Sequence, residues 1–363
     1  MDGMAKCSVL LLPILLLSAC GADQQPSPKT TSAGPPNTEA AKAGSQKVLN
    51  DAIDEGAPGC SAAVGVKGTV VWTGVRGLAD LATEDPLTPD TVFDIASVSK
   101  QFTATALLLL VDAGKLSLDD PLSRHVPELP AWSATVNVGQ LMHQTSGIPD
   151  YIGLLEAQGF AISDRTTQEQ AMRAVAAMPK LTFPPGSQFE YSNSNYLLLG
   201  EIVRRVSAEP LPRFLTDQIF GPLGLAMVMD PIGPIPGKAV AYEADGDDYR
   251  VTTSGWEQVG DGAIQTTPSQ LVHWADNYRT GRLGGAALLD AQLAGAVPTD
   301  DGDKYGAGIF LQPNRTLAHD GDWGGFVTAF WMSKDRTTSV AISCNTDDQD
   351  PVALAGSIAK LWM

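Results

Sequence analysis

The residues best suited to chemistry are Ser97 and Lys100, which stand three apart in the run Phe-Asp-Ile-Ala-Ser-Val-Ser-Lys. Apolar residues from Phe102 to Ala113 cover every face of a helix and Gly114 ends it, so we expect a buried helix beginning at this pair. A Ser and a Lys at this spacing share one helix face, and the N–H groups of a first turn favour negative charge. The pattern predicts a serine nucleophile, an amine to take its proton, and donors for an oxyanion.

A Ser-x-x-Lys pair alone also fits a helix cap beside a solvated lysine, so the interpretation depends on two further patterns. Tyr191 and Asn193 follow a Pro-Pro-Gly turn and precede another apolar helix. A Tyr can carry a proton if a neighbouring Lys ammonium lowers its pKa, and Asn offers both a donor and an acceptor. Taken alone, this pair would be a core Tyr beside a helix-capping Asn.

The third pattern is His319 and Gly321, two apart on a predicted strand that leads into a glycine-rich turn. A Gly there lets a substrate lie against the strand backbone, and the N–H of the next residue, Asp322, can face an oxyanion. A strand His near a turn is more often structural. The chain order of the three patterns favours a catalytic interpretation of all three together.

This set resembles the serine β-lactamase and penicillin-binding-protein superfamily, in particular the class C β-lactamase-like group that also contains D-aminopeptidases, DD-peptidases and esterases. The resemblance covers about residues 46–363. Three more runs are similar to stretches usual in that group, namely Leu141–Ile148, Pro222–Leu225 and Gly260–Pro268. It implies a sheet flanked by helices, a helical lobe, and a site in the cleft between them.

The resemblance also implies roles for the site residues. Ser97 would be the acylated nucleophile and Lys100 would assist its deprotonation. Tyr191 is similar to the proton shuttle that also protonates the leaving group, and Asn193 would position the substrate and Lys100. The oxyanion donors would be the N–H groups of Ser97 and Asp322. The sequence leaves open whether Lys100 or Tyr191 is the main base.

One position departs from the superfamily. His319 stands where β-lactamases and many DD-peptidases have the Lys of Lys-Thr-Gly, and Gly321 is the third position of that element. A mostly neutral His, with Asp320 and Asp322 beside it, should weaken recognition of a substrate carboxylate. We therefore expect neutral esters or substrates with a free amine to be preferred over nitrocefin or a D-Ala-terminated peptide. Protonation of His319 near its usual pH range should partly restore anion binding.

The elements that must position these residues predict an α/β (α+β) fold of the β-lactamase/DD-peptidase type. Strand patterns occur at both chain ends, so we expect a central antiparallel sheet built from both ends and an inserted helical lobe. The sheet lobe would comprise about residues 46–90 and 300–363, and the helical lobe about 91–299. The predicted strands are 60–66, 69–76, 305–311, 316–319, 326–332 and 338–344. The predicted helices are 138–142, 168–178, 195–206, 211–218, 268–278 and 351–361, the fifth with Thr267 and Gln270 as a capping box.

Residues 1–19 fit a lipoprotein signal peptide, with Lys6 followed by a short apolar run that ends in Leu-Ser-Ala-Cys. The resemblance of that ending to a lipoprotein box implies lipid on Cys20, and an ordinary cleaved signal is the alternative. Residues 20–45 would then be a flexible linker, because they contain almost no large apolar residue. Gly21 favours the outer membrane, facing the periplasm, if Gram-negative sorting applies.

The formal net charge of −17 repels nucleic acid and anionic headgroups, so the lipid would be the only membrane link. Cys60 and Cys344 remain after Cys7 leaves with the leader and Cys20 is acylated. In an exported protein they either pair or are two small buried residues, and the sequence leaves this open.

These observations predict an exported serine hydrolase that forms an acyl-enzyme with an ester, amide or D-amino-acid peptide and needs no cofactor or metal. The partner would be a small-molecule or peptide substrate, and the oligomeric state is unspecified. The alternative is a non-catalytic penicillin-binding-like binder or sensor of cell-wall peptides.

Overall fold

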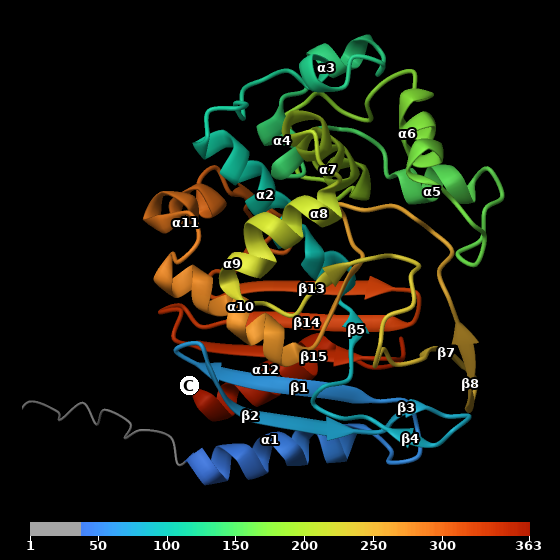
Figure 1. The fold of residues 1–363 in the computed structure, drawn as a ribbon, viewed down its shortest axis with the longest axis vertical. Coiled ribbons are helices and arrows are strands. Elements are labelled where there is room, and N and C mark those ends of the chain that lie inside the picture. The colour runs from blue at the N-terminus through green and yellow to red at the C-terminus, as the bar shows by residue number, and fades with distance from the viewer. Residues whose placement is uncertain (1–37) are drawn as a thin grey trace, which may run out of the picture. The chain divides into compact units, whose positions relative to one another are not determined.

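The centre of the fold is an eight-stranded antiparallel sheet in the computed structural model, which describes residues 38–363 (Figure 1). The predicted signal peptide, Cys20 and most of the predicted linker lie outside the described residues. The strand order combines both chain ends, as the sequence predicted. Along the sheet the strands are β10 (Val297–Pro298), β11 (Lys304–Tyr305), β12 (Phe310–Leu311), β13 (Leu317–Trp323), β14 (Phe326–Met332), β15 (Thr338–Cys344), β1 (Cys60–Val66) and β2 (Thr69–Arg76).

The hairpin between β1 and β2 shows why the sequence specifies this part of the sheet. Lys67 and Gly68 both have positive φ, 50° and 78°, as a two-residue hairpin turn with the right twist requires. The central strands β1 and β15 are buried on both faces, which explains their continuous apolar and small residues. The predicted bounds of β1, β2, β14 and β15 are confirmed.

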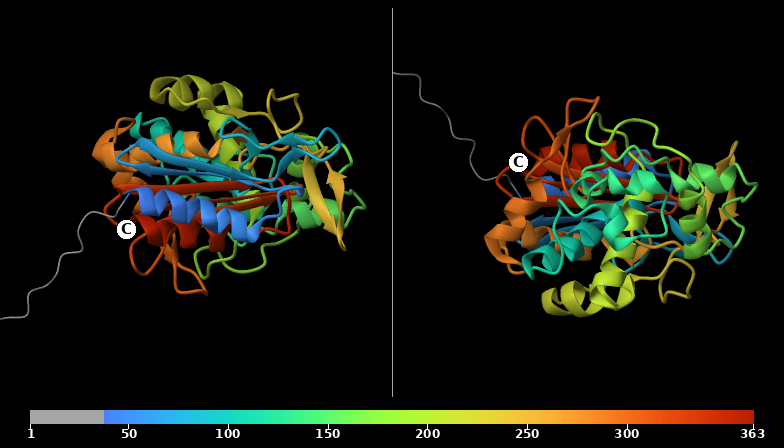
Figure 2. Two further views of the ribbon diagram at one scale, coloured as in Figure 1. Left: turned by 90° about the horizontal axis from the view of Figure 1, so that it is seen from below. Right: turned by 90° about the horizontal axis from the view of Figure 1, so that it is seen from above.

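Helices cover both faces of the sheet (Figure 2). The helices α1 (Thr38–Ala52) and α12 (Pro351–Trp362) pack together on one face, and α10 (Pro268–Thr280) packs on the other. The predicted flexible linker is wrong for residues 38–45, because α1 begins at Thr38. Its Ser45 is buried and accepts a hydrogen bond from Trp362 Nε1 at 2.9 Å, which ties this helix to the C-terminal helix.

The segment between β2 and β10 carries most of the helices. The helix α2 (Lys100–Asp112) is buried on nearly all sides, as its sequence predicted, and contacts α7 (Asn193–Ser207). The short 3₁₀ helix η1 (Ala96–Ser99) leads directly into α2. The other elements are α3 (Leu122–His125), η2 (Ala131–Ala134), α4 (Val138–Met142), α5 (Tyr151–Glu156), α6 (Gln168–Ala176), α8 (Leu211–Leu215), the π-helical turn η3 (Thr216–Phe220), α9 (Gly221–Leu223) and α11 (Gly285–Leu293).

Three short sheets complete the fold and border the helical region. They pair β3 (Leu78–Asp80) with β4 (Asp85–Pro86), β5 (Phe93–Asp94) and β6 (Val228–Met229) with β9 (Ile264–Thr266), and β7 (Ala241–Asp245) with β8 (Asp248–Thr252). None of the helices within residues 38–363 combines the length and the apolar character that crossing a membrane requires.

Three local predictions are wrong. Thr267 is the N-cap residue of α10, but its side chain makes no capping hydrogen bond, and the side chain of Gln270 accepts from the N–H of Ala226 at 2.9 Å instead of completing a capping box. The predicted strand 305–311 is two short strands, since Gly308 turns the chain with a φ of 72°. Helix α10 also lies in the range assigned to the helical lobe although it packs on the sheet.

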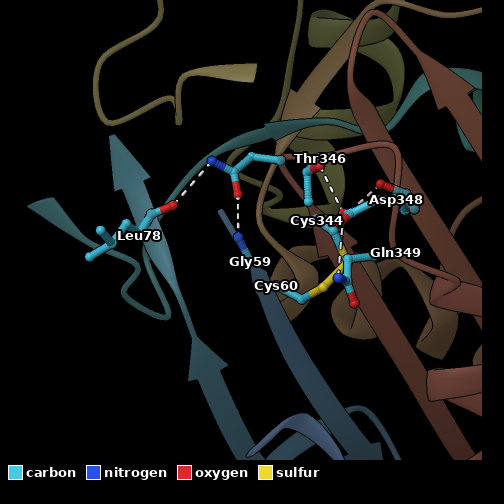
Figure 3. The surroundings of a disulfide bond; sticks show 10 residues. Gly59, Cys60, Leu78, Cys344, Thr346, Asp348 and Gln349 are labelled. Carbon is cyan, nitrogen blue, oxygen red and sulfur yellow. Dashed lines mark hydrogen bonds between the residues drawn. A yellow bond between two sulfur atoms is a disulfide. The ribbon is translucent and has the colours of Figure 1, made fainter. Parts of the chain in front are cut away.

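A disulfide joins Cys60 and Cys344, which are directly paired residues of β1 and β15 (Figure 3). This resolves the alternative that the sequence left open. Beside it, Asn345 accepts from the N–H of Gly59 at 2.8 Å and donates to the carbonyl groups of Leu78 and Val240. The disulfide and this amide thus connect both chain ends to the β7 segment.

Candidate active site

Ser97 lies on η1, which packs against strand β13 of the central sheet. The residue before it, Ala96, has a φ of 45°, a conformation that costs energy for a residue with a side chain. Its N–H donates to the Asp94 carboxylate at 2.8 Å, and burial raises the pKa of that carboxyl. Such strain persists only where surrounding contacts enforce it, which makes this turn a candidate functional feature.

Lys100 is completely buried and its ammonium has three acceptors at close range. Its Nζ donates to Ser97 Oγ at 2.9 Å, to Asn193 Oδ1 at 2.8 Å and to the carbonyl oxygen of Asp261 at 2.7 Å. Burial lowers the pKa of Lys100 to about 8, against the opposing effect of Asp261, Asp150 and Asp320. The amine is therefore available to accept a proton at mildly alkaline pH.

The amide of Asn193 is oriented by Asp150. Asp150 Oδ2 accepts from both the N–H and the Nδ2 of Asn193, at 2.8 and 2.9 Å. Because a carboxylate only accepts, the Asn193 oxygen must point the other way, toward Lys100. The sequence patterns missed Asp150, although it lies only two residues after the family-like run Leu141–Ile148.

Tyr191 lies between Lys100 and the sheet. Lys100 Nζ is 5.0 Å from its ring centroid, and the buried hydroxyl lies near the Ser97 hydroxyl but forms no hydrogen bond of regular geometry with any described residue. Burial raises the pKa of Tyr191 well above its usual value, and only the nearby Ser97 hydroxyl opposes this. The condition set by the sequence argument, a Tyr pKa lowered by Lys100, is therefore not met, and Tyr191 stays protonated.

Gln144 holds the chain on both sides of Tyr191. Its backbone oxygen accepts from Glu190 N–H at 3.0 Å and its side-chain oxygen accepts from Ser192 N–H at 3.1 Å. Gln144 itself has a φ of 58°. Gln144 lies in the turn after α4, and the sequence could not identify it because its role depends on the geometry of that turn.

Asp261 and Tyr151 are further site residues that the sequence patterns did not select. The carbonyl of Asp261 holds Lys100, while its carboxylate accepts from the Tyr151 hydroxyl at 2.9 Å. Burial raises the pKa of the Asp261 carboxyl and that of the Tyr151 hydroxyl. Asp261 occurs in the family-like run Gly260–Pro268, so the resemblance pointed to the segment without a role for this residue.

The structure contradicts the prediction that His319 faces the substrate. Only 3% of His319 is exposed, and it does not line the cavity beside Ser97. Its Nδ1 donates to the Asp320 carbonyl at 2.6 Å, and its Nε2 lies 3.3 Å from the Tyr305 hydroxyl. Burial lowers the pKa of His319 to about 4, and the nearby Lys100 also lowers it. His319 is therefore a neutral residue packed behind Tyr191 and Tyr305.

The strand β13 passes directly beside the nucleophile. It pairs with β12 only at Leu317 and Ala318, and η1 packs beside the rest of the strand. A Cβ on Gly321 would lie 2.9 Å from the backbone nitrogen of Ser97. Gly321 thus allows close packing of strand and nucleophile turn, whereas the sequence argument had assigned this space to the substrate. Asp322 follows it and lines the cavity.

The cavity beside Ser97 has a volume of ≈ 60 Å³. Of the residues selected from the sequence, Ser97, Asn193 and Asp322 line it, while Lys100, Tyr191 and Gly321 support Ser97 from behind. Its remaining walls combine three aromatic and two acidic residues with apolar and small ones. They comprise Asp94, Ala96, Tyr151, Ile152, Pro231, Trp256, Gln258, Asp261, Gly262, Ala263 and Trp323. Within residues 38–363, no group of three or more His, Cys, Asp or Glu is arranged to hold a metal ion.

This fold and this residue set can be compared with known proteins. The Beta-lactamase family model matches residues 39–361, nearly all of the described chain. The chain belongs to the beta-lactamase family. The resemblance found in the sequence, and the fold class derived with it, are confirmed.

Individual beta-lactamase-family relatives are distant. Protein flp of Staphylococcus aureus (strain MW2) is 25% identical over 308 residues, which cover 80% of this chain and 60% of that protein. The penicillin-binding protein homologue of Pyrococcus abyssi has a TM-score of 0.79 at 23% identity, covering 89% of this chain and 76% of that chain. The D-amino acid amidase of Ochrobactrum anthropi SV3 has a TM-score of 0.77 at 23% identity, covering 89% and 98%. These two structures show a shared fold.

Proposed function

We propose that this beta-lactamase-family chain is a serine hydrolase that works through an acyl-enzyme on Ser97. The observation that carries the proposal is the set of partners around Lys100. Two of them, Asn193 Oδ1 and the Asp261 carbonyl, can only accept hydrogen bonds, whereas the Ser97 hydroxyl can also donate. When Lys100 loses a proton, its lone pair is therefore left facing Ser97.

The reaction follows from that arrangement. Ser97 Oγ attacks the substrate carbonyl carbon and gives its proton to neutral Lys100, and the carbonyl oxygen becomes an oxyanion near the N–H groups of Ser97 and Asp322. The oxyanion then collapses, and the leaving group departs with a proton from the Tyr191 hydroxyl, which Lys100 replaces. Water then attacks the acyl-enzyme and gives one proton to Lys100. Lys100 passes this proton to Ser97 Oγ as the acyl–oxygen bond breaks, which releases the acid and restores the Ser97 hydroxyl and the neutral amine.

The substrate class proposed is an ester, an amide or a D-amino-acid peptide whose reacting end is neutral or carries an amine. The cavity wall contributes Asp94, Asp261 and Asp322 but no exposed cation, since Lys100 is buried with all three donors engaged. An anionic group bound beside Ser97 would therefore meet carboxylates without a counter-charge.

A fluorophosphonate probe tests the proposal directly, because it phosphonylates only an activated serine. Wild type should become labelled and Ser97→Ala should not, while a Ser99→Ala variant controls for the other serine of the turn. Absence of labelling in folded wild type, or equal labelling of Ser97→Ala, overturns the enzyme proposal and favours a binder or sensor of cell-wall peptides.

We also propose that the protein is exported and lipid-anchored through Cys20, facing the periplasm from the outer membrane. Disulfides persist in oxidising compartments, so the Cys60–Cys344 bond supports export. Labelling with a fatty-acid analogue in cells should mark wild type and not a Cys20→Ser variant. Equal labelling of the two, or of neither, overturns the anchor.

A further inference from the structure

The cavity beside Ser97 continues into a second, larger compartment. Asp94, Pro231 and Trp323 line both, so the two are contiguous. The second compartment has a volume of ≈ 360 Å³, against ≈ 60 Å³ beside Ser97. The reacting carbonyl group fits the smaller space, and a longer substrate has room only in the larger one.

The walls of the second compartment are apolar on one side and polar on the other. The segment 231–235 reads Pro-Ile-Gly-Pro-Ile, and Ile232 is 50% exposed at its rim. The facing side is made by Thr252, Thr253 and Ser254. Such a mixture suits an extended chain that carries a polar end.

Lys238 gives this compartment a positive charge. It lines the wall, and its Nζ is 4.9 Å from the centroid of the Phe326 ring, which keeps the ammonium at the compartment rather than in bulk solvent. Within residues 38–363, no carboxylate is close enough to form an ion pair with it. The Lys238 ammonium is therefore able to bind an anionic group of a ligand.

Asp94 is the one acidic residue among those that line this compartment, and its carboxylate oxygens bind other groups than Lys238. One carboxylate oxygen accepts from Ala96 N–H at 2.8 Å and the other from Gln265 Nε2 at 2.7 Å. Asp94 is also 4% exposed, and although Lys238 partly offsets the effect of burial on the pKa of this carboxyl, the two groups do not form an ion pair. The charge pattern therefore changes along the cleft, from carboxylates beside Ser97 to an unpaired ammonium at the far end.

We infer that the compartment around Lys238 is a subsite for the remote, anionic end of an extended substrate whose reacting end is neutral. The inference rests on the proposed hydrolase function and adds a second recognition point to it. A carboxylate there would form a charge-assisted contact with Lys238, while the intervening chain lies against Pro231 and Trp323.

The test compares matched esters that differ only at the remote end. These are the mono-p-nitrophenyl half-esters of succinic, adipic and suberic acid and, for each, the same ester with its free carboxylate capped as a methyl ester. In wild type, the ratio of kcat/KM for the carboxylate over the capped ester should rise with chain length. In Lys238→Gln the ratio should fall by about three- to tenfold at the length where it is largest, as expected for a partly exposed charge pair.

Lys115→Gln is the matched control, because this exposed lysine after α2 lines neither compartment. It should leave both the ratio and the individual rates unchanged. Lys238→Glu should lower the ratio further than Lys238→Gln, since it replaces attraction with repulsion. An equal ratio in wild type and Lys238→Gln at every chain length overturns the inference.

Binding measurements separate failure of this inference from failure of the proposed function. If wild type hydrolyses neither ester and is not labelled by the fluorophosphonate probe, the hydrolase proposal fails. Calorimetry with suberic acid monomethyl ester then still tests the subsite, because it needs no turnover. Binding that weakens in Lys238→Gln but not in Lys115→Gln supports the subsite, and equal binding or no binding in all three proteins refutes it.

Discussion

Gly321 of β13 packs closely against the backbone of Ser97 in η1. A Cβ on Gly321 would lie 2.9 Å from the nitrogen of Ser97 and 2.5 Å from the oxygen of Ile95. Position 321 has no room for a side chain, so the position of Ser97 depends on the glycine at 321. The strained φ of 45° at Ala96 occurs in the same turn, and the strand edge is one of the contacts that can enforce it.

The first prediction follows from this contact. Gly321→Ala should lower kcat/KM by about tenfold or more, because the strand or the turn must shift and small displacements of a nucleophile are costly. The free energy of unfolding should fall by about 1–3 kcal/mol, as in other overpacked sites. Stopped-flow acylation and thermal unfolding measure the two effects.

Gly356→Ala is the control for this substitution. Gly356 lies in α12, and a Cβ there meets nothing within 4 Å. This variant should keep its activity and gain up to about 1 kcal/mol, since Ala favours a helix over Gly. A fully active Gly321→Ala protein would show that the contact does not set the position of Ser97.

The second prediction concerns the hydroxyl of Tyr191. Tyr191→Phe removes a buried polar atom that forms no hydrogen bond of regular geometry with any described residue, so the thermal midpoint should stay the same or rise. Turnover should fall by roughly 100-fold if the hydroxyl protonates the leaving group. Steady-state kinetics and calorimetry of the same preparations provide the comparison.

Tyr278→Phe should give the opposite pattern. The Tyr278 hydroxyl donates to the Gln101 side chain at 3.0 Å, so its loss should cost about 1 kcal/mol and leave turnover intact. If Tyr191→Phe behaves in the same way, Tyr191 is a core residue.

The third prediction is a pH dependence set by Lys100. Its pKa is lowered to about 8, and only the neutral amine can take the proton of Ser97. The rate of acylation should therefore rise as pH increases through about 8 and then level off. Lys100→Arg, which keeps the charge but cannot lose a proton, should abolish acylation across the range. A wild-type rate that is flat from pH 6 to pH 10, roughly two units on either side of that pKa, would exclude Lys100 as the base.

The fourth prediction revises the expected effect of pH on anionic substrates. The sequence argument placed His319 titration in its usual range, but burial lowers its pKa to about 4, so it gains charge only below that pH. The ratio of nitrocefin to neutral-ester turnover should then stay constant from about pH 8 to about pH 6, with the ester preferred. The protonation of Lys100 affects the turnover of both substrates, so this effect cancels in the ratio. If the ratio rises at lower pH in wild type but not in His319→Gln, then His319 does titrate in its usual range and contributes to anion binding.

The parts of the fold that the sequence predicted are those in which local pattern and packing agree. Strands β1, β2, β14 and β15 alternate or are continuously apolar between turns, and the Lys67-Gly68 turn fixes the register of β1 with β2. The linker boundary was missed because α1 is helical through its contacts with α12, at the other end of the chain. The composition of the predicted linker, residues 20–45, gives no information about that contact.

The sequence predicted which residues form the core of the site, but it predicted less well how their side chains are arranged. Motif order selected Ser97, Lys100 and Tyr191, which the structure brings together. It could not show that His319 is buried and does not line the cavity, because its position depends on Tyr305 and on the Asp320 carbonyl. Nor could it select Asp150 or Gln144, whose importance lies in hydrogen bonds to distant backbone groups.

The last prediction concerns the disulfide between β1 and β15. It joins residues 284 apart, so in the unfolded protein it closes a loop that includes nearly the whole domain. Replacing both cysteines, as Cys60→Ala with Cys344→Ala, should lower the free energy of unfolding by about 2–5 kcal/mol, because the open chain gains conformational freedom. Reduction of wild type with dithiothreitol under unfolding conditions should bring its midpoint toward that of the double variant, while the double variant should not respond. An unchanged midpoint in both experiments would show that pairing of the strands, with the Asn345 hydrogen bonds at their ends, already supplies the stability of this edge.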